Sequence, residues 1–182
     1  MAVTQKKTWT YEDYYNLNDD KRYEVIEGEL IEMAPAPYYS HQRISGNLYG
    51  LLWNYVQKNK LGDIVTAPTD IILDELNVFQ PDIIFISNEN QKIIQKRGAF
   101  GSPDLLVEIL SKSTKNKDRG VKYESYQNFG VKEYWIVDPM NNTIEVFVLE
   151  KAKYISYCIV QDTEKLKSRI FTDFTVSFSE LI

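Results

Sequence analysis

The sequence predicts a mixed α/β protein in which helices flank a central β-sheet, with an added N-terminal helix and hairpin and further C-terminal strands. Two observations predict this class. The expected elements follow one another along the 182 residues in the order α, β, α, β, β, β, α, β and then more β. Strand-length apolar runs, such as "PDLLVEIL" at 103–110, indicate buried strands that helices must cover. Because no repeat, low-complexity tract or linker interrupts the chain, we expect residues 1–182 to form one domain.

The first elements are predicted by caps and chain breakers. Residues 10–18 are typical of a short helix capped by Thr10. Residues 22–33 alternate like a strand or a hairpin that bends at Gly28, and the prolines of 34–37 end it.

A long helix is expected at 39–59, because its apolar residues recur on one side. Ser40 is the expected N-cap, and Gly62 is expected to terminate the helix.

The remaining strands are expected at 63–73, 78–86, 104–110, 133–139, 143–150 and 154–160. Residues 87–102 are polar and predict a surface excursion. Ser113 or Thr114 is expected to cap a helix that runs to about Phe129 and stops at Gly130.

Composition restricts the compartment and the partners. No apolar run approaches the length of about 20 residues that crosses a bilayer, and the N-terminus lacks a signal peptide's apolar core. Cys158 is the single cysteine, so no internal disulfide is possible. We therefore expect a cytoplasmic protein without a membrane partner. The net charge of −5 disfavours non-specific nucleic-acid binding by the whole surface, but it allows a local basic site.

Three acids, Glu24, Asp82 and Glu108, lie in apolar rows, where a carboxylate is costly unless it is paired. Strand alternation places each beside apolar neighbours: Glu108 with Leu106 and Leu110, Asp82 with Ile84 and Ile86, and Glu24 with Ile26 and Leu30. One such acid alone is more often a structural hydrogen-bond acceptor. Two on adjacent strands repel one another and must share a proton or a cation. If the strands are neighbours, Asp82 and Glu108 therefore predict a Mg²⁺ site.

Lys122 shares a helix face with Tyr126 and Phe129 by i+4 and i+7 spacing. Either it points towards the sheet with these aromatic residues, or its amine reaches water at the rim. Lys122 ends a basic run, 112–122, that contains one acid, Asp118. The plain interpretation of this run is a solvated helix start. The other basic residues of the run are Lys112, Lys115, Lys117 and Arg119.

Two stretches, "QPDIIF" (80–85) and "SPDLLVEILSKSTKNKDRGVKYESYQNFGVKEYWIVDP" (102–139), closely resemble a bacterial family of restriction-endonuclease-like proteins of uncharacterised function. That family falls in the PD-(D/E)xK nuclease superfamily. The resemblance extends over residues 22–182 and is most specific in 102–139. It implies a restriction-endonuclease-like core and an endonuclease that hydrolyses phosphodiester bonds of nucleic acid with Mg²⁺ or Mn²⁺. DNA is the nucleic acid that we expect.

The resemblance also implies roles for individual residues. Asp82 matches the motif aspartate and Glu108 the motif acid, and the carbonyl of Ile109 is a further expected metal ligand. The usual lysine two positions after the acid is absent, because Leu110 stands there. Lys122 on the following helix is its match, with Lys112 as the alternative.

Glu24 and His41 lie in stretches that match the family's N-terminal half, so they are additional candidates for the site. A polar or capping role fits the lone histidine equally well. Asp104 belongs to a second Pro-Asp pair, but it lies about 13 Å from Glu108 along one strand, too far to share an ion. We expect it to serve a strand-end turn or to contact the basic segment.

The resulting hypothesis is that the ion activates water for attack on a phosphodiester. Lys122 would orient that water or stabilise the transition state, and nucleic-acid contacts would come from Lys112, Lys115, Lys117 and Arg119. Two alternatives remain: a catalytically silent nucleic-acid-binding or regulatory module, and a purely structural acid pair without an ion. The apolar tail, 143–182, suggests a homodimer.

Overall fold

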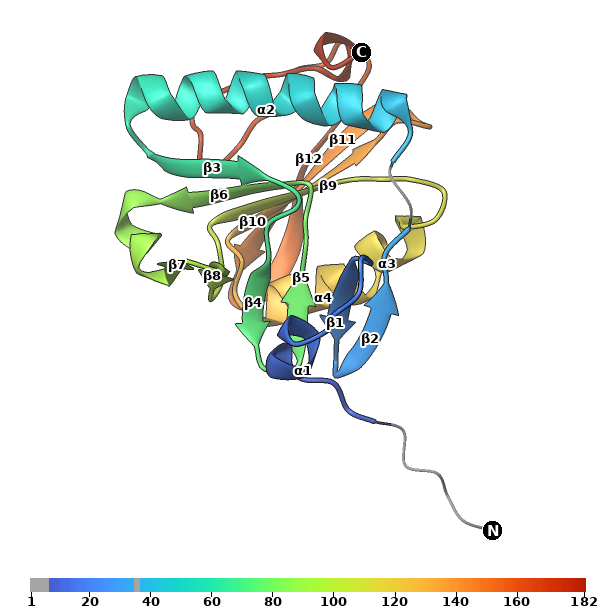
Figure 1. Ribbon diagram of the computed structural model, residues 1–182. Helices are drawn as coiled ribbons and strands as arrows, with labels where there is room; N and C mark the ends of the chain where they lie inside the picture. Colours follow the sequence, from blue (N-terminus) through green and yellow to red (C-terminus); the bar gives the residue numbers. More distant parts are fainter. Residues whose placement is uncertain (1–6, 35–36) are drawn as a thin grey trace.

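The computed structural model describes residues 7–34 and 37–182 (Figure 1). Four α-helices are described: α1 (Tyr11–Tyr15), α2 (Tyr39–Asn59), α3 (Lys115–Arg119) and α4 (Val121–Asn128). Two 3₁₀ helices, η1 (Asn88–Ile93) and η2 (Phe178–Glu180), accompany them. None of the described helices is both long and apolar enough to cross a bilayer.

The strands form two six-stranded mixed sheets, so the predicted mixed α/β class is confirmed with a second sheet added. The main sheet has the order β12-β11-β10-β9-β6-β3. Its strands are β3 (Gly62–Thr66), β6 (Ile83–Ser87), β9 (Leu105–Ile109), β10 (Glu133–Asp138), β11 (Thr143–Glu150) and β12 (Lys153–Gln161).

The second sheet has the order β2-β1-β5-β4-β8-β7. Its strands are β1 (Tyr23–Ile26), β2 (Glu29–Glu32), β4 (Ile71–Asp74), β5 (Asn77–Phe79), β7 (Ile94–Gln95) and β8 (Gly98–Phe100). The predicted hairpin at Gly28 is therefore confirmed, and it forms one end of this sheet. Residues 87–102 are not a simple surface excursion, because they supply η1, β7 and β8 and bury Ile93 and Ala99.

Strand alternation in the main sheet separates two apolar cores. On β9, Leu105, Val107 and Ile109 face α2, while Leu106 and Glu108 face α4 and the second sheet. Figure 1 shows α2 over one face of the main sheet, with the C-terminal tail beside it, and α4 with the second sheet on the other side.

The long helix forms because apolar residues four apart, from Ile44 through Leu48 and Leu52 to Val56, are all buried against the main sheet. Its predicted caps are wrong. Tyr38, without a side-chain cap, precedes the helix, and Ser40 lies inside it. Lys60 takes the left-handed terminating conformation (φ 53°, ψ 48°).

Gly62 instead begins β3, where a Cβ atom would lie 2.1 Å from the carbonyl oxygen of Ile86. Glycine is needed here because the two strands approach so closely.

Two predicted strands, 63–73 and 78–86, each divide at a proline. Pro68 separates β3 from β4, and Pro81 separates β5 from β6. In both cases the chain leaves one sheet and joins the other. Because proline has no N–H to donate, it suits the points where strand pairing is interrupted.

The helix after β9 is also divided, at Gly120, into α3 and α4. Thr114 stands at the N-cap position as expected, but its hydroxyl bonds to Ser111 and not to the helix. Gly130 follows α4 with φ of +83°, which confirms it as the stop.

Of the apolar C-terminal part, 143–182, β11 and β12 join the main sheet, and the tail after β12 adds no strand. It buries Leu166, Phe171 and Phe174 against the α2 face of the main sheet. Glu133 on β10 fixes it by accepting hydrogen bonds from the amides of Arg169 (2.9 Å) and Ile170 (3.1 Å).

Asp104, from the second Pro-Asp pair, locks the start of β9. Its carboxylate accepts hydrogen bonds from the amide of Ser87 (2.7 Å) and the side chain of Asn90, and pairs with Lys132. The strand-end role is therefore confirmed, although the basic partner is Lys132 and not the 112–122 segment. Burial alone would raise the pKa of Asp104, but the bonds from Lys132 and Ser87 hold it below the ordinary value of 3.8.

We expect Asp104→Asn to lower the free energy of unfolding at pH 7 by about 1–3 kcal/mol, because charged hydrogen bonds are lost. A lowered pKa means that the stabilisation is complete above pH 3.8 and disappears as the pH falls through the folded-state value. Urea unfolding of both proteins across this pH range measures the difference. Asp173→Asn, at an exposed position, is the control and should change nothing. Equal stability of Asp104→Asn and wild type at pH 7 would contradict the lock.

Candidate active site

A buried lysine stands at the centre of an acidic cluster between the two sheets. The Nζ atom of Lys122 lies 2.8 Å from Oε1 of Glu24, 2.9 Å from Oε1 of Glu108 and 3.6 Å from Oδ1 of Asp118. All four residues are at most 4% exposed. Lys122 therefore points inward, and its amine does not reach the solvent rim.

Each member of the cluster comes from a different local rule. Glu108 faces α4 by strand alternation on β9, and Asp118 and Lys122 meet because they are four residues apart. Glu24 faces inward on β1 with Ile26, but Leu30 does not share this face as predicted. The hairpin register pairs Glu24 with Ile31, because the turn reverses the alternation.

Asp82 reaches the same place from the neighbouring strand. The register of β6 and β9 pairs Ile83 with Val107, so the next position along sets Asp82 opposite Glu108. Directly opposite residues in a sheet have Cβ atoms about 5 Å apart. Oδ2 of Asp82 accepts a hydrogen bond from the amide of Ile109 at 2.7 Å. The two strands are therefore adjacent, as the metal hypothesis required.

His41, in the first turn of α2, lies near the same oxygen of this carboxylate. Its Nε2 lies 2.9 Å from the carbonyl oxygen of Ile109 and 3.5 Å from Oδ2 of Asp82. Burial alone would lower the pKa of His41, but Asp82 and the Ile109 carbonyl raise it overall. A protonated His41 would thus hold Asp82 and Ile109 together.

The cluster holds more carboxyl groups than its one amine can balance. Burial raises the pKa of Glu108 well above its ordinary value despite Lys122, and Asp118, Asp82 and Glu24 raise it further. Burial likewise raises the pKa of Asp118. Burial opposes the charge of Lys122, but the surrounding carboxylates outweigh it and raise its pKa well above 10.5. The site therefore keeps its ammonium and favours any additional positive charge.

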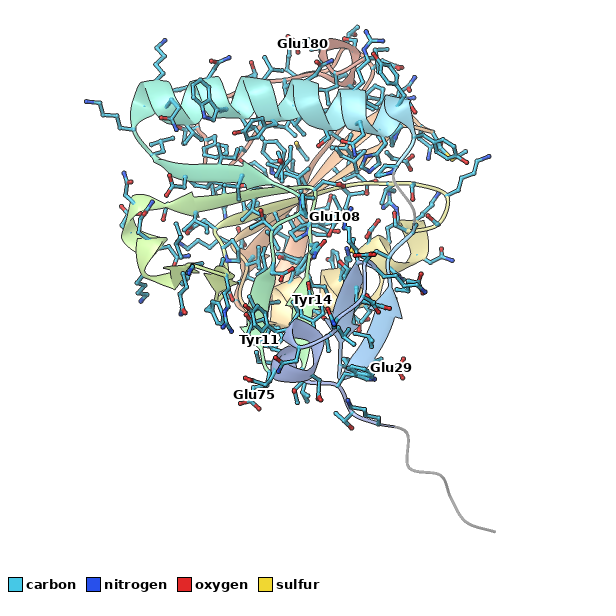
Figure 2. The ribbon with its side chains drawn as sticks, in the orientation of Figure 1. Tyr11, Tyr14, Glu29, Glu75, Glu108 and Glu180 are labelled. Carbon is cyan, nitrogen blue, oxygen red and sulfur yellow. The ribbon has the colours of Figure 1, made fainter. Side chains whose placement is uncertain are left out.

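A cavity of about 780 Å³ opens beside these residues. Its walls include Glu24, His41, Asp82, Glu108 and Lys122, so the structure brings together all the predicted catalytic and additional site residues. Ile109 also lines it. Figure 2 shows Glu108 deep inside the molecule, between the α2 layer and the β1–β2 hairpin.

The predicted nucleic-acid contacts divide into two kinds. Lys112 and Lys115 are exposed, and Lys117 lines the cavity. Arg119 is held by an ion pair with Glu145 on β11. Lys122 contacts three acids of the cluster, whereas Lys112 is exposed and makes no ion pair with a described residue. The geometry therefore favours Lys122 as the displaced lysine.

The donor set fits a hard divalent cation. Oδ1 of Asp82 and Oε2 of Glu108 make no hydrogen bond to any described residue, and the Ile109 carbonyl is beside them. Within the described residues, no three His, Cys, Asp or Glu side chains converge on one point as a metal site. An ion here would thus be held by two carboxylates, a carbonyl and waters, which is how Mg²⁺ usually binds.

Asp118 is the site residue that our sequence reasoning missed. We counted it as the single acid of a basic run, although the i, i+4 rule that turned Lys122 inward applies to it equally. Both of its oxygens are buried and have no hydrogen-bond partner among the described residues. Tyr126 is a second omission, since its hydroxyl donates to Oε1 of Glu108 at 2.9 Å.

Comparisons with known proteins give the family and the fold. Residues 10–179 match the model of the Uma2 family, described as "Putative restriction endonuclease". An uncharacterised protein of Synechocystis sp., sll1609, is 26% identical over 148 residues, which cover 80% of this chain and 83% of the relative. A crystal structure described as a "putative nuclease belonging to DUF820" from Anabaena variabilis superposes with a TM-score of 0.78 at 16% identity, covering 94% of this chain and 96% of the other. At that identity the likeness shows a shared fold.

We expect Asp118→Asn to raise the free energy of unfolding at pH 7, without added metal, by about 1 kcal/mol. The pKa of Asp118 is raised, so its ionised form opposes folding above pH 3.8, and the gain should vanish below that pH. Urea unfolding measures it.

Asp138→Asn is the matched control, because Asp138 is equally buried but accepts hydrogen bonds from Met140 (3.0 Å) and Asn141 (2.8 Å). That variant should lose stability. A loss of equal size in Asp118→Asn would contradict the excess of negative charge.

Proposed function

The chain belongs to the Uma2 family, and from this premise we propose that it is a Mg²⁺- or Mn²⁺-dependent endonuclease that hydrolyses phosphodiester bonds in DNA. The observation that carries the proposal is the meeting of Asp82 and Glu108, from separate strands, in one cavity beside the Lys122 ammonium. We assign this activity to one domain, residues 1–182, of a cytoplasmic protein.

The chain would hold the ion through the carboxylates of Asp82 and Glu108 and the carbonyl of Ile109. When bound, a divalent ion lowers the pKa of water and neutralises charge on the phosphate. His41 supports the arrangement, because its Nε2 is 2.9 Å from the Ile109 carbonyl and 3.5 Å from Asp82. A ligand set fixed by such neighbours needs little rearrangement during the reaction.

Lys122 supplies the fixed positive charge. Its raised pKa keeps the amine protonated, so it can orient the attacking water or stabilise the negative charge that develops on the phosphate. Glu24 positions it, since the 2.8 Å contact holds the amine between the second sheet and β9.

The rim of the cavity provides backbone contacts. Lys112, Lys115 and Lys117 lie on the loop and helix that follow β9, where they can meet phosphates next to the bond that is cut. Arg119 would join them only by leaving Glu145.

We expect Asp82→Asn, Glu108→Gln and Lys122→Met each to reduce DNA cleavage with Mg²⁺ or Mn²⁺ by at least about 100-fold, because each removes a group that binds the metal or stabilises the transition state. Nicking of plasmid DNA measures this. Asp104→Asn changes the aspartate of the other Pro-Asp pair. This variant should cleave like wild type under conditions in which it is folded. Equal activity of all four variants and wild type would reject the assignment.

Two further outcomes separate the alternatives. Nucleic-acid binding without any product under either metal would identify a silent binding module. Calorimetry with Mn²⁺ distinguishes a metal site from a structural acid pair: the heat should be present in wild type and absent in Glu108→Gln. No heat in wild type would leave only the structural pair.

The protein also has an edge through which two chains can pair, and we propose a homodimer on this basis. β12 is an edge strand of the main sheet, and residues 154–160 carry no charge. Ile155, Tyr157 and Ile159 are 39%, 39% and 59% exposed. Antiparallel pairing of two copies along β12 would cover the open edge and these exposed side chains.

We expect Ile159→Lys to convert a dimer into a monomer, because it buries a charge at the pairing edge. Size-exclusion chromatography with light scattering at micromolar concentration measures the mass. The control is Val65→Lys on β3, the opposite edge of the same sheet, where the side chain is also 39% exposed. A monomeric wild type would refute the proposal.

A further inference from the structure

An exposed tyrosine stands at the lip of the active-site cavity. Tyr38 is 80% exposed and yet is one of the residues that line the cavity. It immediately precedes α2, three residues before His41. Its side chain makes no hydrogen bond or ring contact to any described residue. Its place in the fold therefore does not depend on internal packing.

The geometry points to Tyr38 as a stacking platform for a nucleobase next to the bond that is cut, and hence to a single strand or a locally unpaired strand as the substrate. This inference rests on the proposed nuclease function and names its substrate class. Aromatic rings bind bases of any sequence through their faces, which is how many proteins hold single strands.

The depth of the site supports an unpaired substrate. Glu108 and Lys122 are each 4% exposed, so a phosphate must enter the cavity to meet them. A volume of about 780 Å³ falls within the range of pockets that enclose one small ligand. A duplex is stiff over about 150 base pairs, whereas an unpaired strand, including a locally unpaired region of a plasmid, can bend to bring one phosphate into such a space.

The wall of the cavity supplies the second feature of a single-strand groove, a basic contact for the backbone. Ser111, Ser113, Thr114 and Lys117 line it, and all lie on the segment after β9. A strand entering the cavity would thus meet an aromatic ring as well as hydroxyl and ammonium groups on its walls.

Tyr39 provides a matched control within the same turn. It follows Tyr38 in the sequence and is 83% exposed, but it does not line the cavity. Tyr38 has extended backbone and Tyr39 begins the helix, and only Tyr38 borders the cavity. A general effect of losing an exposed tyrosine would appear in both variants, and a stacking effect only in Tyr38→Ala.

The test is fluorescence anisotropy with a labelled 12-nucleotide single strand and with its duplex, in Ca²⁺ and with the DNA checked to be intact afterwards. We expect wild type and Tyr39→Ala to bind the single strand equally and more tightly than the duplex. Tyr38→Ala should bind it about 5- to 100-fold more weakly, the usual effect of losing one stacked base. Tyr38→Phe should restore binding, because the ring is kept. Circular dichroism confirms that the variants fold.

Abasic substitution identifies the stacked base directly. Removing one base at a time from the single strand should reveal a position where wild-type binding weakens, whereas Tyr38→Ala binding does not weaken further, because the two changes remove the same contact.

Two results overturn the inference alone: wild-type affinity in Tyr38→Ala, or tighter binding of the duplex than of the single strand. Cleavage that depends on Asp82 and Glu108 would then leave the proposed function intact. Failure of wild type to bind either form of DNA overturns both proposals together.

Discussion

The arrangement of the molecule depends on one buried ammonium. Lys122, on α4, contacts Glu24 of the second sheet at 2.8 Å and Glu108 of the main sheet at 2.9 Å. Burying any one of these charges alone is prohibitive, so the helix and the two sheets must meet for each of them to be tolerated. The interaction therefore joins the layers of the fold and, at the same time, sets the electrostatic character of the cavity between them.

A buried acid is structural or functional according to its partners, and two neighbouring strands show the contrast. Glu133 on β10 accepts hydrogen bonds from the indole of Trp135 and from backbone amides of the tail, and it is fully buried. Such donors satisfy the hydrogen-bonding capacity of the carboxylate, so its role is structural. Glu108 on β9 is bound by a lysine and a tyrosine hydroxyl, faces other acids and borders a cavity. The excess of carboxyl groups over amines around Glu108 favours the binding of a cation.

Routing of the chain between the sheets brings the site together. At Pro68 and at Pro81 the chain leaves one sheet for the other, and the second of these exchanges places Asp82 immediately before β6, at the position opposite Glu108. A single long strand through Pro81 would continue in one sheet, and it would not bring the β1–β2 hairpin near Asp82 and Glu108. The fold is shared at low identity with a structure of the same class, because such routing depends on apolar alternation and chain breaks more than on particular side chains.

The sequence by itself determined what acts within one element: the apolar faces on which Asp82 and Glu108 lie, and the helical periodicity of α2. These follow from periods of 2 and 3.6 residues, which are local. The sequence predicted the hairpin at Gly28 and the inward Lys122 each as one of two alternatives, and the structure decided between them. Only the tertiary structure decided that the strands of Asp82 and Glu108 are adjacent, that a second sheet brings Glu24 to the amine, and that Asp118 belongs to the cluster. Such contacts depend on register and on layers packed across long sequence separations, which no local pattern specifies.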